Sequence, residues 1–169
     1  MKQVLPDWAI GPFVKYENNP VLSPSSEGFD SWTVYNSAVA VKDGKYYMFY
    51  RAESRDEMDT PYCGTSRIGL ATSGDGYSWK RSDKPIIDAD LKWEMPGGCE
   101  DPRIVKVGDM WHLLYTGYAY PDNVFICDAV SKDLLHWQKK GPIFKKESAA
   151  GMNSKSACVV CNPSGEAVK

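Results

Sequence analysis

The sequence lacks long apolar runs and has no excess of charge of one sign. Its 169 residues include 20 Lys and Arg against 22 Asp and Glu, and the two signs are interspersed. No basic face for nucleic acid is expected, and no apolar run approaches the length that crosses a bilayer. The first residues, MKQVLPDWAIGPF, also lack the apolar region and cleavage site of a secretory signal. We expect a cytoplasmic protein with no nucleic-acid or membrane partner.

Cysteine and histidine are too few and too scattered for a disulfide framework or a metal centre. The five cysteines form an odd set without framework spacing, which favours reduced thiols. Cys158 and Cys161 form one Cys-x-x-Cys pair, but a zinc site needs two more ligands, and the two histidines lie far away in the sequence. No nucleotide-binding glycine motif or Ser-His-Asp set is present. We therefore expect no metal and no organic cofactor.

Helical periodicity is almost absent, whereas aromatic residues, proline and glycine are plentiful. Aromatic residues make up 12% of the chain, with 11 prolines and 14 glycines, a pattern typical of short strands joined by turns. The segment 36–51, NSAVAVKDGKYYMFYR, divides into two apolar strands around Asp43 and Gly44, a pair that favours a tight hairpin. The sequence therefore predicts an all-β fold.

The hairpin phrase recurs after about 65 residues as DPRIVKVGDMWHLLYT, residues 101–116. The following segment recurs as well, since GLATSGDGYSWKRSDKPII is matched by ICDAVSKDLLHWQKKGPIF, with Trp79 aligned to Trp137. A third copy begins with SACVVCNPSGEAVK, and the early phrase NPVL matches the last strand of a copy. Four short strands in each copy are typical of a β-propeller blade, although a β-sandwich is the alternative.

The repeat boundaries predict one domain over residues 1–169, built as part of a β-propeller. Blade 1 is expected at about 31–88, blade 2 at about 99–145, the start of blade 3 at about 153–169 and a closing strand at about 18–23. Blades bury their faces only against neighbouring blades, so two blades leave apolar surface exposed. We expect either a fragment of a longer protein or a homo-oligomer in which several chains close the ring.

Polar residues at the start of each copy are the first candidates for a site, because the innermost strands of a propeller line its central pocket. The first copy begins with Asn36 and Ser37, and the second with Asp101, Pro102 and Arg103. Proline disfavours the helical conformation for the residue before it, which suits a rigidly held Asp101. On a regular strand Asp101 and Arg103 share a face, and Glu100 points elsewhere. The alternative is a structural ion pair between Asp101 and Arg103.

The segment from about 19 to 143 resembles glycoside hydrolase family 130, the β-mannoside phosphorylases and related mannosidases. The resemblance rests on NPVL, YNSAV, FYR, SRIGLATS, GGCEDPRI, YTGY and DLLHW. It covers only the amino-terminal part of the family, and it implies a five-bladed β-propeller, of which this chain holds about two blades and part of a third.

The resemblance also implies a reaction and assigns roles to residues. Asp101 corresponds to the general acid, which protonates the glycosidic oxygen through a hydroxyl of the mannosyl ring. Inorganic phosphate, as co-substrate, attacks from the opposite face and gives α-mannose 1-phosphate with inversion. Asn36, Ser37, Arg51 and Arg67 are then assigned to the sugar hydroxyls and phosphate of an oligosaccharide or small β-mannoside. Paired guanidinium hydrogen bonds suit phosphate, and an asparagine amide suits a diol.

Three further residues are candidates for the substrate site, each with a structural alternative. Glu53 lies on the same strand face as Arg51 and can form an ion pair with it. Arg103 is close to Asp101 in sequence, and a cation there would lower the pKa that a general acid needs. Tyr118 can stack on a sugar ring or belong to the core.

One departure from the family leaves other functions open. The family's phosphorylases carry a basic residue after a Phe-Pro pair near the start of the third copy, whereas this chain has Asn162 and Pro163. An inverting β-mannoside hydrolase, in which a second carboxylate activates water, is therefore an alternative. Another propeller glycosidase and a non-catalytic carbohydrate-binding propeller are the remaining ones.

Overall fold

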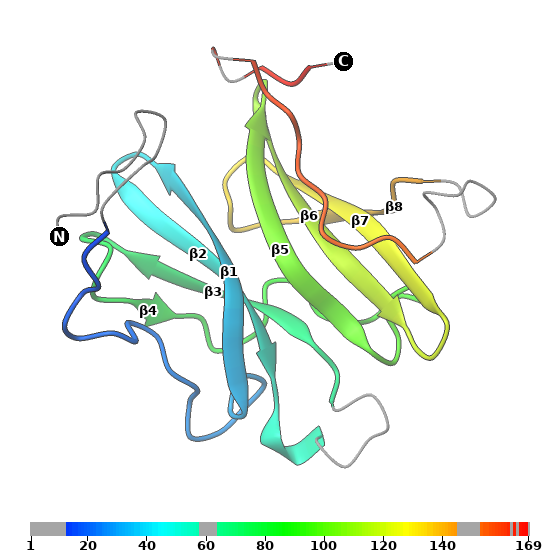
Figure 1. Cartoon of the computed structure of the whole chain (residues 1–169), viewed down its shortest axis with the longest axis horizontal. Coiled ribbons are helices and arrows are strands. Elements are labelled where there is room, and N and C mark those ends of the chain that lie inside the picture. The colour runs from blue at the N-terminus through cyan, green and yellow to red at the C-terminus, as the bar shows by residue number, and fades with distance from the viewer. Residues whose placement is uncertain (1–12, 58–63, 145–152, 163, 165, 169) are drawn as a thin grey trace, which may run out of the picture.

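Two four-stranded antiparallel sheets form the structure, a computed structural model that describes residues 13–57, 64–144, 153–162, 164 and 166–168 (Figure 1). Strand order follows chain order in both sheets. The all-β prediction is confirmed, since a 3-10 turn at Arg55–Glu57 is the one helical element of the described part. The first sheet contains β1 (Thr33–Lys42), β2 (Lys45–Glu53), β3 (Arg67–Ser73) and β4 (Lys80–Arg81), and the second contains β5 (Gly98–Val107), β6 (Met110–Ala119), β7 (Asn123–Ser131) and β8 (Gln138–Pro142).

The two hairpins that the repeat predicts are present in the same register. In β1–β2 the last pair is Lys42 with Lys45, and the turn between them places Asp43 and Gly44 at φ 51° and 72°. In β5–β6 the corresponding turn contains Gly108 at φ 59°. Glycine and aspartate tolerate this left-handed backbone, which matches the twist of a two-residue hairpin.

The turns between the third and fourth strands are also built alike. In the first sheet the hydroxyl of Ser73 and the carboxylate of Asp75 accept backbone N–H groups of the turn, and Trp79 Nε1 donates to the carbonyl of Gly76 at 3.0 Å. In the second sheet Ser131, Asp133 and Trp137 repeat these hydrogen bonds. The aligned tryptophans of the sequence repeat are therefore equivalent in space.

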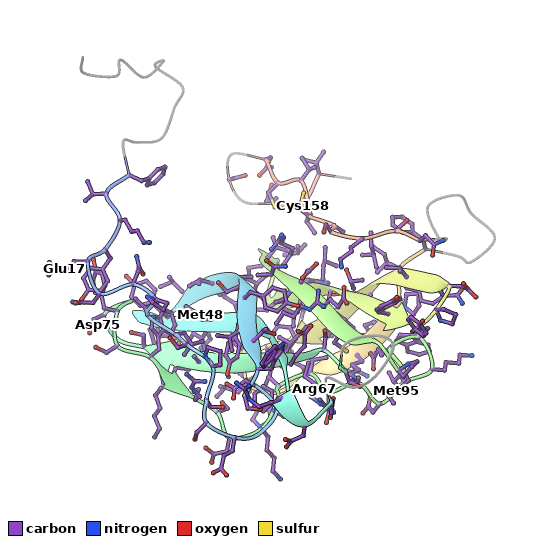
Figure 2. All side chains as sticks on the ribbon, turned by 60° about the horizontal axis from the view of Figure 1, so that its bottom comes forward. Glu17, Met48, Arg67, Asp75, Met95 and Cys158 are labelled. Carbon is purple, nitrogen blue, oxygen red and sulfur yellow. The ribbon has the colours of Figure 1, made fainter. Side chains whose placement is uncertain are left out.

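Side chains of both sheets fill the space between them (Figure 2). The rings of Phe49 and Trp137 lie nearly perpendicular at a centroid distance of 5.5 Å, a contact between the two sheets. A parallel bridge between Ser66 and Gly98 links the start of β3 to the start of β5. The buried cluster consists of Ala40, Phe49, Ile68, Leu70, Ile87, Cys99, Leu113, Tyr115, Cys127, Ala129 and Leu134.

The two ends of the chain carry the expected partial copies, and their assignment to blades stays a prediction. Residues 18–23, where a closing strand is expected, contain a turn and bends and pair with no strand in the described part of the chain, and the closing strand stays a prediction. Val21 and Leu22 instead cover a second apolar cluster around Met48 and Tyr50. Beyond residue 152, an isolated bridge is the described pairing of the expected third copy. The expectations for residues 1–12, Cys63 and the end of the second copy at 145 lie outside the described residues.

The described cysteines are free thiols, as the sequence predicts, with Cys99 and Cys127 buried. Among the described residues, no helix is long and apolar enough to cross a membrane.

Candidate functional site

Asn36 and Asp101 occupy equivalent β-bulges at the starts of the two copies. In the first sheet residues 36–37 lie opposite Tyr50, and in the second sheet residues 101–102 lie opposite Tyr115. Asn36 has φ 47° and Asp101 has φ 50°, a left-handed conformation that costs a side-chain-bearing residue roughly 1–2 kcal/mol. Bulges redirect side chains, and strained residues of this kind cluster at functional sites.

The two bulges meet because β1 lies beside β5 (Figure 1). Asn36 Nδ2 donates a hydrogen bond to Asp101 Oδ1 at 2.7 Å, and Asp101 is only 7% exposed. The contact therefore joins the two residues that the sequence repeat aligns.

Arg51, from the end of β2, is the centre of the surrounding cluster. Its Nη2 lies 2.8 Å from Glu53 Oε1 and 3.0 Å from Glu100 Oε1, while its Nη1 lies 3.4 Å from Asp101 Oδ1. Its Nε donates to the hydroxyl of Ser66 at 3.0 Å. One planar guanidinium thus holds carboxylates from both sheets, which a point charge on a flexible stem could not do.

Glu53 anchors this arginine and is itself held by three hydroxyl groups. Thr33 donates to its Oε2 at 2.7 Å, Tyr35 donates to its Oε1 at 2.7 Å, and Ser66 donates to its Oε1 at 2.9 Å. Burial alone would raise the pKa of Glu53, but these hydrogen bonds and Arg51 outweigh burial and lower it. Glu53 is therefore an ionised, fully bonded anchor.

Lys155 is a site residue that the sequence argument missed. Its Nζ lies 3.3 Å from Asp101 Oδ2 and also contacts Glu100 Oε2. The residue precedes Ser156 and Ala157, as Asn36 precedes Ser37 and Ala38, so the third copy of the repeat carries the signal for it.

The cluster holds Asp101 in its ionised form. Burial raises the pKa of this carboxyl, but the hydrogen bond from Asn36 and the charges of Lys155 and Arg51 together lower it below its usual value. Two cations therefore lie against three carboxylates, and an anion that approached the cations would compete with Asp101 for them.

Arg103 does not share a face with Asp101, so this expectation is wrong. The bulge inserts an extra residue and reverses the alternation of side chains, which leaves Arg103 exposed. It borders a hollow of about 300 Å³ between β1 and β5, which Ser37 also lines. Glu100 was expected to point elsewhere, yet it pairs with Arg51 and Lys155.

Arg67 has partners outside the cluster and is neither free nor simply solvated. Its Nη2 lies 3.0 Å from Glu57 Oε1, and its Nε lies 2.9 Å from Asp88 Oδ1. A role in binding substrate stays a prediction for this residue, and it would require a change of partner.

Tyr118 borders an open, largely polar hollow of about 590 Å³ on the other side of Glu100. Its ring lies 5.9 Å from the ring of Tyr120, at an angle of 71°. Glu100 and Lys155 belong both to this hollow and to the cluster, so the two are adjacent. The lining residues are Glu100, Tyr118, Pro121, Asp122, Val124, Asn153 and Lys155.

Relatives of the chain act on mannosides. The 1,2-β-oligomannan phosphorylase of Thermoanaerobacter sp. (strain X514) is 34% identical over 132 residues, which cover 76% of this chain and 44% of that protein. The β-1,2-mannobiose phosphorylase of the same organism is 35% identical over 133 residues, again 44% of its length. The chain thus spans less than half the length of these curated relatives.

Solved structures similar to the chain also come from a family of mannoside phosphorylases. One comes from work on the GH130 family of mannoside phosphorylases, which contains glycoside hydrolases that target β-1,2 mannosidic linkages in Candida mannan. It has a TM-score of 0.78 and 35% identity, covering 89% of this chain and 46% of that one. The family model described as β-1,4-mannooligosaccharide phosphorylase matches residues 11–166. The chain therefore belongs to glycoside hydrolase family 130.

Proposed function

We propose that the chain supplies the general acid and the anion-binding half of an inverting β-mannoside phosphorylase. The observation that carries the proposal is the position of Asp101, which is buried, receives a hydrogen bond from Asn36 and lies between the cations Arg51 and Lys155. Mannoside phosphorylases among the relatives support the substrate class.

In this proposal an oxygen of inorganic phosphate attacks the anomeric carbon of the mannosyl unit, and the bond to the glycosidic oxygen breaks. The departing oxygen receives a proton that originates on Asp101 and passes through a ring hydroxyl. Asp101 then regains a proton from the phosphate, so the products are α-mannose 1-phosphate and the released sugar. Arg51 and Lys155 bind the phosphate through charge-assisted hydrogen bonds.

The charges of the cluster explain how an ionised carboxylate can serve as an acid. In the arrangement described above, Lys155 and Arg51 lower the pKa of Asp101. Phosphate bound to both cations would offset their charge and bring a negative charge close to Asp101, which favours its protonated form. Binding of the co-substrate thus prepares the acid for the reaction.

We propose that the two sheets are two blades of the five-bladed β-propeller expected from the sequence. Their equal strand orders, bulges and turns support this arrangement, as does the exposed apolar surface at Val39 and Val41 on β1. In a ring, β1 and β5 would face the central pocket with Asp101 at its wall.

Replacing Asp101 by Asn tests the proposal. The purified protein is incubated with β-1,2-mannobiose, with and without phosphate, and mannose 1-phosphate and mannose are quantified. Loss of a general acid costs about 10²–10⁴-fold in rate, so Asp101→Asn should lose at least about 100-fold in turnover. Asp109→Asn, at an exposed turn of the same sheet, serves as the matched control and should keep full activity. Full turnover in Asp101→Asn, or no product from any β-mannoside, contradicts the proposal.

An inverting hydrolase is the second candidate, favoured by the structure that represents hydrolases of the family and by the missing basic residue after Asn162. The same incubation separates the two reactions. A hydrolase releases free mannose at the same rate without phosphate, whereas a phosphorylase requires phosphate.

A further inference from the structure

A triad of a buried carboxylate, a buried tyrosine and a partly buried cation recurs in the two sheets. In the first sheet Tyr50 donates its hydroxyl hydrogen to Asp30 Oδ2 at 3.0 Å, and Arg81 Nη1 lies 2.6 Å from the same oxygen. The carboxylate comes from the segment before β1, the tyrosine from β2 and the cation from β4. The triad therefore connects the segment before β1 with β2 and with β4, the last strand of the sheet.

The second sheet repeats the triad with different residues. Tyr115 donates to Glu94 Oε1 at 2.7 Å, and Lys139 Nζ lies 2.7 Å from Glu94 Oε2. The positions correspond in sequence, since Tyr115 aligns with Tyr50 and Lys139 aligns with Arg81, each cation standing two residues after the repeated tryptophan. Because the triad occurs in both copies, we infer that it is part of the structure of the repeat.

Both carboxylate oxygens of Glu94 have hydrogen-bond partners, although the side chain is completely buried. Besides Tyr115 and Lys139, its Oε2 accepts the backbone N–H groups of Asp90 at 3.2 Å and Leu91 at 3.1 Å. Burial would lower the pKa of Lys139, but hydrogen bonds to Asp90 and Glu94 outweigh burial and raise it, which keeps the lysine charged. Removing either partner of an ion pair bonded in this way is strongly destabilising, because the other charge is left without a partner.

The triad of the second sheet is connected to the candidate site at two points. The backbone carbonyl of Glu94 accepts the N–H of Gly98, the first residue of β5. Tyr115 lies directly opposite the bulge that contains Asp101 and Pro102. The same residue therefore holds both places, the start of β5 through its backbone carbonyl and the strand facing the bulge through its carboxylate.

We propose that Glu94, Tyr115 and Lys139 are positioning residues that hold the β5 bulge, and with it the carboxylate of Asp101, against Asn36 and Arg51. The role rests on the function proposed above. None of the three touches the reacting groups, so they act through the bulge. A displacement of about 1 Å at a reacting group can cost on the order of 100-fold in rate, which makes such support effective.

Tyr115→Phe tests the proposal, because it removes one hydroxyl and keeps the ring in place. We expect kcat for phosphorolysis of β-1,2-mannobiose to fall about tenfold or more, with KM changed less than about twofold. Lys139→Met tests the same chain of contacts from β8 and should also lower kcat. Lys139→Arg, which copies the cation of the first sheet, should retain it.

A matched control separates positioning from general loss of stability. Ser131→Ala removes a buried hydroxyl from the same sheet, at the end of β7, where Ser131 pairs with Trp111 and not with Tyr115. Urea unfolding should show a loss of stability in both Ser131→Ala and Tyr115→Phe, while kcat falls only in the second.

Carbon-13 NMR titration of the Asp101 carboxyl gives a readout that does not depend on activity. The pKa of Asp101 should rise toward its usual value in Tyr115→Phe and stay unchanged in Ser131→Ala. A wild-type protein without activity on β-mannosides would refute the proposed function, and the titration would still decide the positioning role. Unchanged kcat and unchanged Asp101 pKa in Tyr115→Phe overturn the inference, as does an equal effect of Ser131→Ala.

Discussion

Gly98 leaves no room for a side chain, and Gly98→Ala should destabilise the fold strongly. Its φ is 110°, and a Cβ built on it would lie 2.2 Å from the carbonyl oxygen and 2.3 Å from the nitrogen of Ser66. Ser66 cannot yield easily, because its N–H donates to Gly97 and its carbonyl accepts the N–H of Cys99 at 2.7 Å.

The expected loss follows from three contributions. A side chain in this backbone region costs about 1–3 kcal/mol, and overpacking adds about 1–3 kcal/mol. Breaking the two hydrogen bonds of the Ser66 bridge adds about 1 kcal/mol for each. The sum, about 4–8 kcal/mol, is comparable with the total stability of many domains.

Urea unfolding with linear extrapolation measures the loss, and Gly108→Ala supplies the control. Gly108 also has a positive φ, 59°, but a Cβ there meets nothing within 4 Å. Gly108→Ala should therefore lower the free energy of unfolding by only about 1 kcal/mol, which is the cost of the left-handed backbone alone. If the two variants differ by less than about 1 kcal/mol, the contact between Ser66 and Gly98 does not limit the packing of the sheets as described.

Two further predictions concern the charged cluster. The folded state lowers the pKa of Asp101 and Glu53, so their contribution to stability is present above the unfolded values of about 4 and is lost as pH falls through the folded values. Urea midpoints between pH 2.5 and 7 should show this loss, and Asn36→Ala, which removes a hydrogen bond to Asp101, should reduce it; an unchanged pH dependence would contradict this assignment. Arg51→Lys should raise the KM for phosphate about tenfold, because one ammonium group cannot replace the guanidinium contacts with both sheets. An unaltered KM would remove Arg51 from the proposed phosphate site.

Local patterns predicted much of the fold. The turn pair at Asp43 and Gly44 and its counterpart at Gly108 fix the hairpins, because hairpin geometry depends on a few adjacent residues. The repeated tryptophans, Trp79 and Trp137, marked the corresponding turns in both sheets. Arg51 and Glu53 were predicted together from their spacing on one strand, and the structure pairs them.

The parts of the site that were not predicted depend on the bulges and on contacts between distant segments. A regular strand placed Asp101 beside Arg103, whereas the bulge separates them and turns Glu100 toward Arg51. Pro102 was a usable signal, since it cannot donate to the strand ladder. Lys155 reaches Asp101 across more than fifty residues of chain, and its one signal in the sequence is its alignment with Asn36 in the repeat.

The contact between the two bulges places a limit on how similar the repeated units can be. If the two copies were identical, the contact between the bulges would hold either two carboxylates or two amides. Two carboxylates would repel each other, and two amides would carry no charge. The two copies differ at this position, with Asn36 in the first and Asp101 in the second, so one side donates and the other accepts. The hydrogen bond between the two bulges, and the one carboxylate placed there, therefore depend on a difference between the two copies.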